Sequence, residues 1–328
     1  LRREKLQEHF NLGVRPTDIN HESFNVKDYD KVILWACPWT DRTSYLLINL
    51  LDKFTAAGVP IMYIQSDPEF YNPNRESLIF KVLKNEYPHI YSNIKQYATC
   101  YPFGVEKLQE VTKGCEIKFI QTVYDKTFEQ SITTLSGKEF VFQFPGPLGY
   151  RDTLLGQLDK VIGLNNLLSV FWNESSREFE KAMKRSTTIT NPLLEYSENP
   201  FVSFSFSPIY LPYPEFLEFQ RSSLMGFMDS TDRKNGEDEN NNFHTARVCN
   251  NCYSGILSMV TDTYSLRTEI EKSVYDTMCL ERLSRSDLET IVKDEELYQH
   301  TVEAQRKEMD KHFSIEKWYP EYLEMIGK

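Results

Sequence analysis

Two carboxylates that stand two residues apart are the first candidates for chemistry in this chain. Asp67 and Glu69 flank a proline directly after the apolar run 61–64. Such a pair can hold Mg²⁺ or Mn²⁺ while the phosphates of a substrate complete the octahedron, and it could instead supply a general base. Asp also begins many turns and helices as a cap, so a purely structural role stays open. We predict that Asp67, Glu69 and Asp41 are the catalytic carboxylates.

The turn resembles the Asp-x-Asp turn of glycosyltransferases in position and charge only. Glu69 stands where those enzymes have their second Asp, and the turn follows the second strand that we predict, earlier than in that fold. The resemblance implies a divalent metal held beside substrate phosphates.

Polar residues also follow the first predicted strand, 32–36. Thr40 and Arg42 flank Asp41 there, and we predict that they contact substrate. Cys37 lies between this strand and a predicted helix, where the pKa of a thiol can fall enough for it to act as a nucleophile. A small buried apolar residue is the alternative for Cys37, and we favour it.

The segment 146–153 favours anion binding. It follows a predicted strand, contains Gly146 and Gly149, and opens a predicted helix beside Arg151. Unpaired backbone N–H groups at a helix start, next to a guanidinium, suit phosphate or carboxylate. Neither the Gly-Lys-Ser/Thr of a P-loop nor the three spaced glycines of a dinucleotide site is present. An ordinary turn shaped by Gly and Pro is the alternative.

Three potential zinc ligands are spaced as His-x4-Cys-x2-Cys. They are His244, Cys249 and Cys252, and the Cys-x2-Cys spacing is typical of zinc knuckles. The spacing is comparable to that of the zinc motif in the Maelstrom domain, an RNase H-like fold, although Asn241 stands where its first Cys would be. A helix start whose cysteines face a core is the alternative.

The elements that must position these residues alternate between strand and helix. We predict strands at 32–36, 61–64, 115–124 and 139–144, with amphipathic helices between them, whereas 87–114 is hard to assign. Alternation of this kind indicates a mostly parallel sheet with helices on both faces, because parallel strands need long crossovers. Apolar and Ser residues alternate over 201–207, which predicts an antiparallel edge strand. The predicted fold class is α/β with a helical C-terminal part.

The chain is divided by composition into three regions. We predict an α/β sheet domain over 1–170, a strand- and loop-rich extension over 171–245 with an acidic loop at 230–242, and a helical region over 246–328 that could pack on the first domain.

Charge and cysteine content narrow the partners. Lys plus Arg total 37 and Asp plus Glu 48, a formal charge of −11, so nucleic acid is an unfavourable partner. Six scattered cysteines fit reduced thiols in cytosol or nucleus. No apolar run reaches the roughly 18 residues of a membrane helix, and the charged start does not predict a signal peptide. We expect a cytoplasmic or nuclear protein that does not enter a membrane.

These patterns favour an α/β enzyme that binds a phosphate-bearing or nucleotide-activated small molecule, most simply a transferase. Two hypotheses compete with it. The first is an inactive enzyme-like fold that binds a protein partner through the aromatic run 210–219 and its C-terminal helices. The second is a zinc-stabilised, RNase H-like domain that processes nucleic acid.

Overall fold

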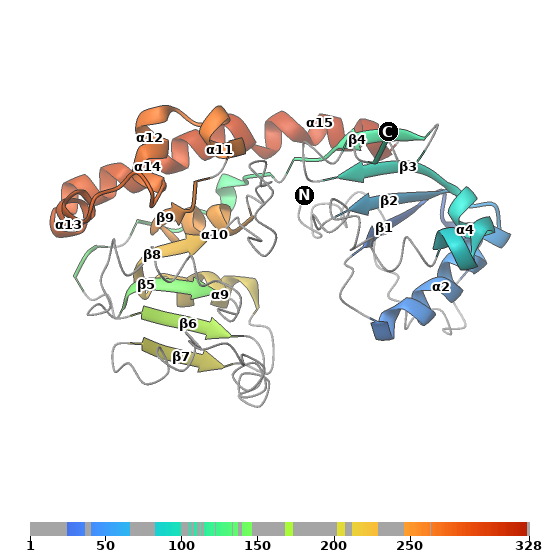
Figure 1. Ribbon diagram of the computed structural model, residues 1–328, viewed down its shortest axis with the longest axis horizontal. Helices are drawn as coiled ribbons and strands as arrows, with labels where there is room; N and C mark the ends of the chain where they lie inside the picture. Colours follow the sequence, from blue (N-terminus) through green and yellow to red (C-terminus); the bar gives the residue numbers. More distant parts are fainter. Residues whose placement is uncertain are drawn as a thin grey trace, which may run out of the picture. The chain divides into compact units, whose positions relative to one another are not determined.

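The structure is a computed structural model of the 328-residue chain. It describes residues 25–36, 41–65, 83–99, 105, 108–109, 112, 115–121, 123–132, 134–136, 140–145, 168–172, 202–206, 212–228, 246–262 and 264–326. The chain forms two compact units, unit 1 with residues 1–122 and 318–328 and unit 2 with residues 123–317 (Figure 1). The chain therefore leaves unit 1 after residue 122 and returns to it after residue 317.

Unit 1 contains a parallel sheet of four strands. In spatial order they are β1 (Val32–Ala36), β2 (Ile61–Gln65), β3 (Ile94–Thr99) and β4 (Glu116–Phe119). The 3₁₀ turn η2 (Val26–Asp28) precedes them, α2 (Asp41–Ala56) connects β1 to β2, and α4 (Pro88–Ser92) precedes β3. Gly58, at φ +77°, follows α2 as predicted, since a left-handed residue after a helix favours Gly.

The core of unit 1 lies between α2, α4 and one face of this sheet. Tyr63 and Tyr97, both 1% exposed, face each other from β2 and β3 with ring centroids 5.8 Å apart. Strand β3 was not predicted. Its segment Ile94–Thr99 carries Lys95 and Gln96 among its apolar residues, so its pattern is neither a continuous apolar run nor a strict alternation.

Unit 2 contains a second parallel sheet, of five strands. Their spatial order is β7 (Val202–Phe206), β6 (Leu168–Trp172), β5 (Phe140–Pro145), β8 (Ser223–Met228) and β9 (Leu257–Val260). The chain thus begins in the middle of the sheet, builds outward to β7, and then continues on the other side of β5. The strand order reverses between β5 and β8.

The α/β class with parallel sheets and a helical C-terminal part is confirmed. The predicted edge strand is present as β7, but its predicted antiparallel direction is wrong, because β7 pairs with β6 in parallel. Alternation of apolar and polar residues indicates that one face of a strand is exposed to solvent. An edge strand can have such a face whether it pairs in parallel or antiparallel.

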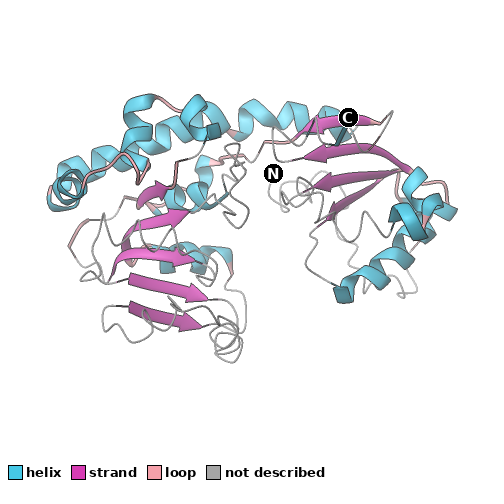
Figure 2. Ribbon diagram, viewed as in Figure 1, coloured by secondary structure: helices cyan, strands magenta, loops and turns pink. Residues whose placement is uncertain are grey.

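The helices of unit 2 follow or connect its strands. They are η4 (Lys126–Phe128), α9 (Tyr213–Gln220), α10 (Ala246–Ser254), α11 (Tyr264–Glu269), α12 (Lys272–Met278), α13 (Arg285–Lys293) and α14 (Glu295–Phe313), followed by α15 (Ile315–Ile326), which continues into unit 1. Figure 2 shows α12 and α14 beside β9, the strand at one edge of the second sheet. None of the described helices is both long and apolar enough to cross a bilayer.

The division of the chain differs from the predicted domains. Strand β5 pairs with β6 and β8 rather than with the first four strands, so the first unit ends at residue 122 and not near 170. The sheet of unit 2 also includes β9, inside the region that we expected to be helical. Leu257–Val260 has only four residues, one of them Ser258, and periodicity cannot distinguish so short a segment from part of a buried helix.

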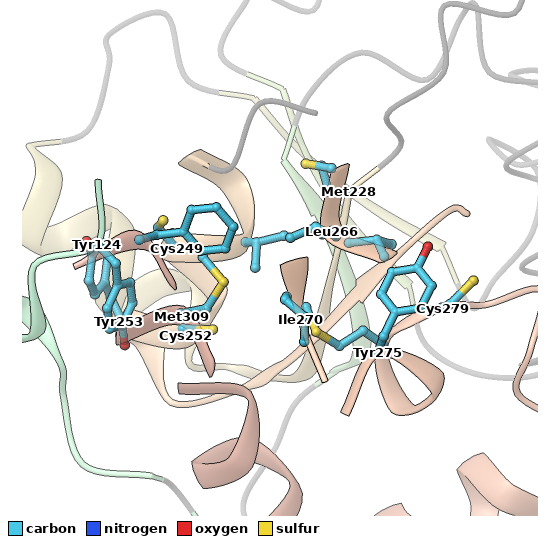
Figure 3. Close-up of a cluster of buried hydrophobic side chains, with 14 of the residues drawn as sticks. Tyr124, Met228, Cys249, Cys252, Tyr253, Leu266, Ile270, Tyr275, Cys279 and Met309 are labelled. Carbon is cyan, nitrogen blue, oxygen red and sulfur yellow. The ribbon is translucent and has the colours of Figure 1, made fainter. Parts of the chain in front are cut away.

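The core of unit 2 surrounds α10 (Figure 3). Tyr124 and Tyr253 stack at 4.8 Å between ring centroids, with the planes 11° apart. Arg306, 6% exposed, donates from its guanidinium Nε to the carbonyl oxygen of Cys252 at 2.8 Å and from Nη2 to that of Gln130 at 2.6 Å. A cation at the carbonyl end of α10 is favourable, and here it fixes the helix against the segment after residue 123.

Candidate functional site

The carboxyl edge of the first sheet is where most of the predicted site residues begin. All four strands run parallel, so their carboxyl ends share one edge, and Ala36 at the end of β1 lies opposite Gln65 at the end of β2. Asp41 and Arg42 open α2, five residues beyond β1. Thr40, Asp67 and Glu69 lie outside the described residues. The structure therefore leads the chain into both predicted segments from neighbouring strands.

A cavity of about 180 Å³ lies at the same edge, where β4 ends. Residues 118–121 form one side of it and the last turns of α15 the other, so every lining residue belongs to unit 1. The lining residues are Lys118, Phe119, Ile120, Gln121, Trp318, Glu321, Tyr322, Glu324 and Met325. The sequence did not suggest this site, because the two segments that form it are about two hundred residues apart in the chain.

Aromatic side chains and one buried hydrogen bond hold the walls of this cavity together. Trp318 packs edge-on against Phe119, with ring centroids 6.2 Å apart and planes at 85°. Tyr322, 5% exposed, donates its hydroxyl to the carbonyl oxygen of Gln121. The Nζ of Lys118 lies 3.3 Å from Glu324 and 3.4 Å from Glu116. These contacts join α15 to the end of β4.

The ionised forms of these groups stabilise one another. Hydrogen bonds from Gln96 and from Lys118 hold the pKa of Glu116 below its usual value, and the bond to Glu324 raises the pKa of Lys118. Because Lys118 is 30% and Glu324 77% exposed, solvent screens the pair, which contributes little to stability. The cavity thus presents one ammonium group and the carboxylates of Glu321 and Glu324.

The carboxyl edge of the second sheet has a different feature, the reversal of strand order between β5 and β8. In open α/β sheets, ligands bind beyond the carboxyl ends of the strands at such a switch point. Gly146, Gly149 and Arg151 follow β5 directly, and although they lie outside the described residues, the strand that leads to them is at the switch point. Arg151 and Asp67 thus follow strands of different sheets, because β5 belongs to the second sheet and β2 to the first.

A polar network organises the same edge where β9 ends. Asp262 accepts hydrogen bonds from Arg267 at 3.0 Å and from the hydroxyl of Tyr275 at 2.7 Å, and its backbone N–H donates to Glu281 at 2.9 Å. Arg282 lies over the ring of Tyr275, 5.0 Å from its centroid. Two partly exposed guanidinium groups therefore stand beside the carboxyl end of β9 on a rigid support.

Zinc is not supported. Cys249 and Cys252 lie in the core, 2% and 0% exposed, and Cys249 directs its Sγ to the carbonyl oxygen of Val123 at 4.0 Å. Burial raises the pKa of Cys252 to about 12, whereas a zinc ligand must be a thiolate. His244 lies outside the described residues, and the described part of the chain contains no group of three His, Cys, Asp or Glu side chains placed to bind a metal. The core alternative for the two cysteines is correct.

Comparisons with known proteins agree on the fold. No family model and no curated protein matches the sequence. Among solved structures, T4 phage BGT in complex with UDP and Mn²⁺ superposes with a TM-score of 0.56 at 14% identity, over 93% of this chain and 85% of that one.

Two further structures show the same likeness. An α-glucosyltransferase bound to UDP and a 13-mer DNA containing an HMU base superposes with a TM-score of 0.59 at 12% sequence identity. The match covers 92% of this chain and 81% of that one. Sucrose-phosphate synthase from Thermosynechococcus elongatus superposes with a TM-score of 0.59 at 11% sequence identity, over 99% of this chain and 79% of that one. At these identities the likeness concerns the fold alone, and the chain has a fold like that of GT-B glycosyltransferases.

Proposed function

We propose that this chain is a transferase that moves a sugar from a nucleotide-activated donor to a hydroxyl group of an acceptor. The observation that carries the proposal is the switch point between β5 and β8, in a fold shared with proteins solved in complex with UDP. The anion site that the sequence predicts directly after β5 would lie at this switch point.

The anionic part of the donor is assigned to the segment after β5. Backbone N–H groups around Gly146 and Gly149 would cradle the diphosphate, and Arg151 would neutralise part of its charge with paired hydrogen bonds. Thr40 and Arg42 would contact the substrate from the edge of the first sheet. These roles rest on residue types and on the strands that precede them.

Acid–base work is assigned to the carboxylates at the edge of the first sheet. In the transfer, the acceptor oxygen bonds to the anomeric carbon while the bond from that carbon to the phosphate oxygen breaks. The acceptor proton passes to a carboxylate, for which Asp41 and Asp67 are the candidates, and the nucleoside diphosphate leaves. Asp67 and Glu69 are hard oxygen ligands of the type that suits Mg²⁺ or Mn²⁺, which would supply charge neutralisation to the leaving group.

The acceptor is not specified by charge alone. Residues 123–317 contain 31 Asp and Glu against 21 Lys and Arg, whereas unit 1 contains 17 against 16. The acidic excess that disfavours nucleic acid thus belongs to unit 2. One similar structure holds DNA, so a DNA acceptor is the alternative to the small-molecule acceptor that we propose.

Calorimetric titration with UDP tests the proposal. Wild-type protein should bind UDP, more tightly with Mn²⁺ present, and Arg151→Ala should weaken binding by about tenfold or more, the value of a hydrogen-bonded charge. Arg285→Ala is the matched control, because that exposed arginine pairs with Glu289 on α13, and it should bind UDP as wild type does. If the wild-type protein binds neither UDP nor UDP-sugars, with or without Mn²⁺, the result would favour the hypothesis of an inactive enzyme-like fold that binds a protein partner.

A further inference from the structure

The cavity at the end of β4 has polar side chains to which the proposed transfer reaction assigns no role. Gln121 and Glu321 line it, and neither side chain has a hydrogen-bond or ion-pair partner among the residues that the structure describes. Trp318 is half-buried at the same cavity, beside them. Free hydrogen-bonding groups beside an aromatic side chain, at the carboxyl edge of a parallel sheet, are what a ligand site of an α/β protein requires.

We propose that this cavity is a subsite for a neutral, hydroxyl-bearing ring of the acceptor, such as a single pyranose. The inference names the acceptor class and so rests on the proposed function. Its basis is the combination of an aromatic wall, a free carboxylate, a free amide and one ammonium group within about 180 Å³.

Charge selects a neutral ligand. Glu321 and Glu324 together outweigh Lys118, so a phosphate group placed here would meet a net negative lining. Hydroxyl groups face no such repulsion. They can donate to the carboxylate of Glu321, which only accepts, and both donate to and accept from the amide of Gln121.

Size and shape favour one ring. Pockets for drug-sized ligands hold roughly 300–1,000 Å³, so a cavity of this volume suits a single small ring rather than a dinucleotide or an oligosaccharide. The indole of Trp318 offers an apolar surface to the C–H groups of such a ring. Lys118 has three donors and two carboxylate neighbours, which leaves one donor for a ligand oxygen.

The probe for the test is methyl β-D-glucopyranoside, measured by saturation-transfer NMR titration on the full chain. Wild type should bind it with millimolar affinity, and Glu321→Gln should weaken binding by about tenfold, because a hydrogen bond to a charged group is lost. Gln121→Ala should weaken it as well. Glu316→Gln, an exposed residue earlier in α15 and outside the cavity, is the matched control and should bind as wild type. Glu321 is exposed, so its variant should fold normally.

The outcomes separate this inference from the proposed function. The subsite is overturned if the glucoside does not bind, or if it binds equally well to wild type and to Glu321→Gln. It is also overturned if the cavity binds thymidine, a nucleoside, and not the glucoside. If UDP binds in those cases, the transferase proposal stands. If the glucoside binds as expected and UDP does not, the cavity is a sugar-binding site, but the transferase proposal fails and with it the role of the cavity in binding an acceptor.

Discussion

The side-chain amide of Asn251 occupies the space that a Cβ on Gly226 would need. Its Oδ1 lies 2.1 Å from that position, while its Nδ2 donates to the carbonyl oxygen of Gly226 at 3.0 Å and to Oγ of Ser258 at 3.2 Å. The Oδ1 accepts from Gln220 at 3.2 Å. This buried network holds α10 against β8 and β9.

Gly226→Ala should therefore destabilise the protein by about 3 kcal/mol, because the new methyl group displaces the amide and leaves buried polar groups unpaired. Urea denaturation followed by circular dichroism measures the change. The double variant Gly226→Ala with Asn251→Ala should lose less than the sum of the two single variants, since the second change makes room for the methyl group. Additive losses would show that the two residues do not compete for this space.

Arg306 should be a major determinant of the stability of unit 2. Replacing it with Met keeps the apolar contacts of the side chain but removes its bonds to the carbonyl groups of Cys252 and Gln130, at an expected cost of about 3 kcal/mol. Lys307→Met, one residue further along α14 on an exposed site, should cost less than about 0.5 kcal/mol. Thermal unfolding compares the two, and equal losses would contradict the role given to Arg306.

Glu308 should make stability depend on pH. Burial by itself would raise the pKa of its carboxyl, but the backbone N–H of Glu271 at 2.8 Å and Lys311 at 2.9 Å together hold that pKa below the usual value. A carboxyl whose pKa is lowered by folding stabilises the protein fully above its unfolded pKa of about 4.3, and this contribution is lost as the pH falls through the folded pKa.

The gap in stability between wild type and Glu308→Gln should accordingly be about 2 kcal/mol at pH 7 and shrink below about pH 4.3. Denaturant midpoints across the pH range give this curve. Glu303→Gln is the control on the same helix. Because the native Glu303 lies 3.9 Å from Lys307, at the limit of an ion pair, its replacement should change the stability only slightly at any pH. A gap for Glu308→Gln that does not change with pH would exclude the ionised carboxylate as its cause.

Thiol alkylation should follow burial. The pKa of Cys252 is raised to about 12 and that of Cys279 to about 11, in both cases mainly by burial, and thiols react as thiolates. Among the four described cysteines, iodoacetamide at pH 8 should modify the half-buried Cys115 first and leave Cys249, Cys252 and Cys279 unmodified until the protein unfolds. Peptide mass spectrometry resolves the order. Stoichiometric zinc in the purified protein, or labelling of Cys252 as early as Cys115, would contradict the conclusion that Cys249 and Cys252 are buried core residues.

Local patterns were sufficient for much of the secondary structure. The apolar run 32–36, the helical spacing after Asp41 and the Gly58 stop all predicted elements that the structure contains, because each depends on residues within one or two turns. Strands β3, β6, β8 and β9 were not predicted for the same reason, because their segments carry no decisive local pattern and pair only once their neighbours are in place.

The sequence by itself determined the α/β class. It also indicated the segments after β1, β2 and β5 as candidate binding loops, and it offered burial in the core as one of two roles for Cys249 and Cys252. Only the tertiary structure decided that β5 starts a second sheet and that the strand order reverses beside it. It alone brought Gln121 and Glu321 to one cavity. Strand pairing and cavity formation join residues far apart in the chain, and their free energy comes from contacts that no local spacing encodes.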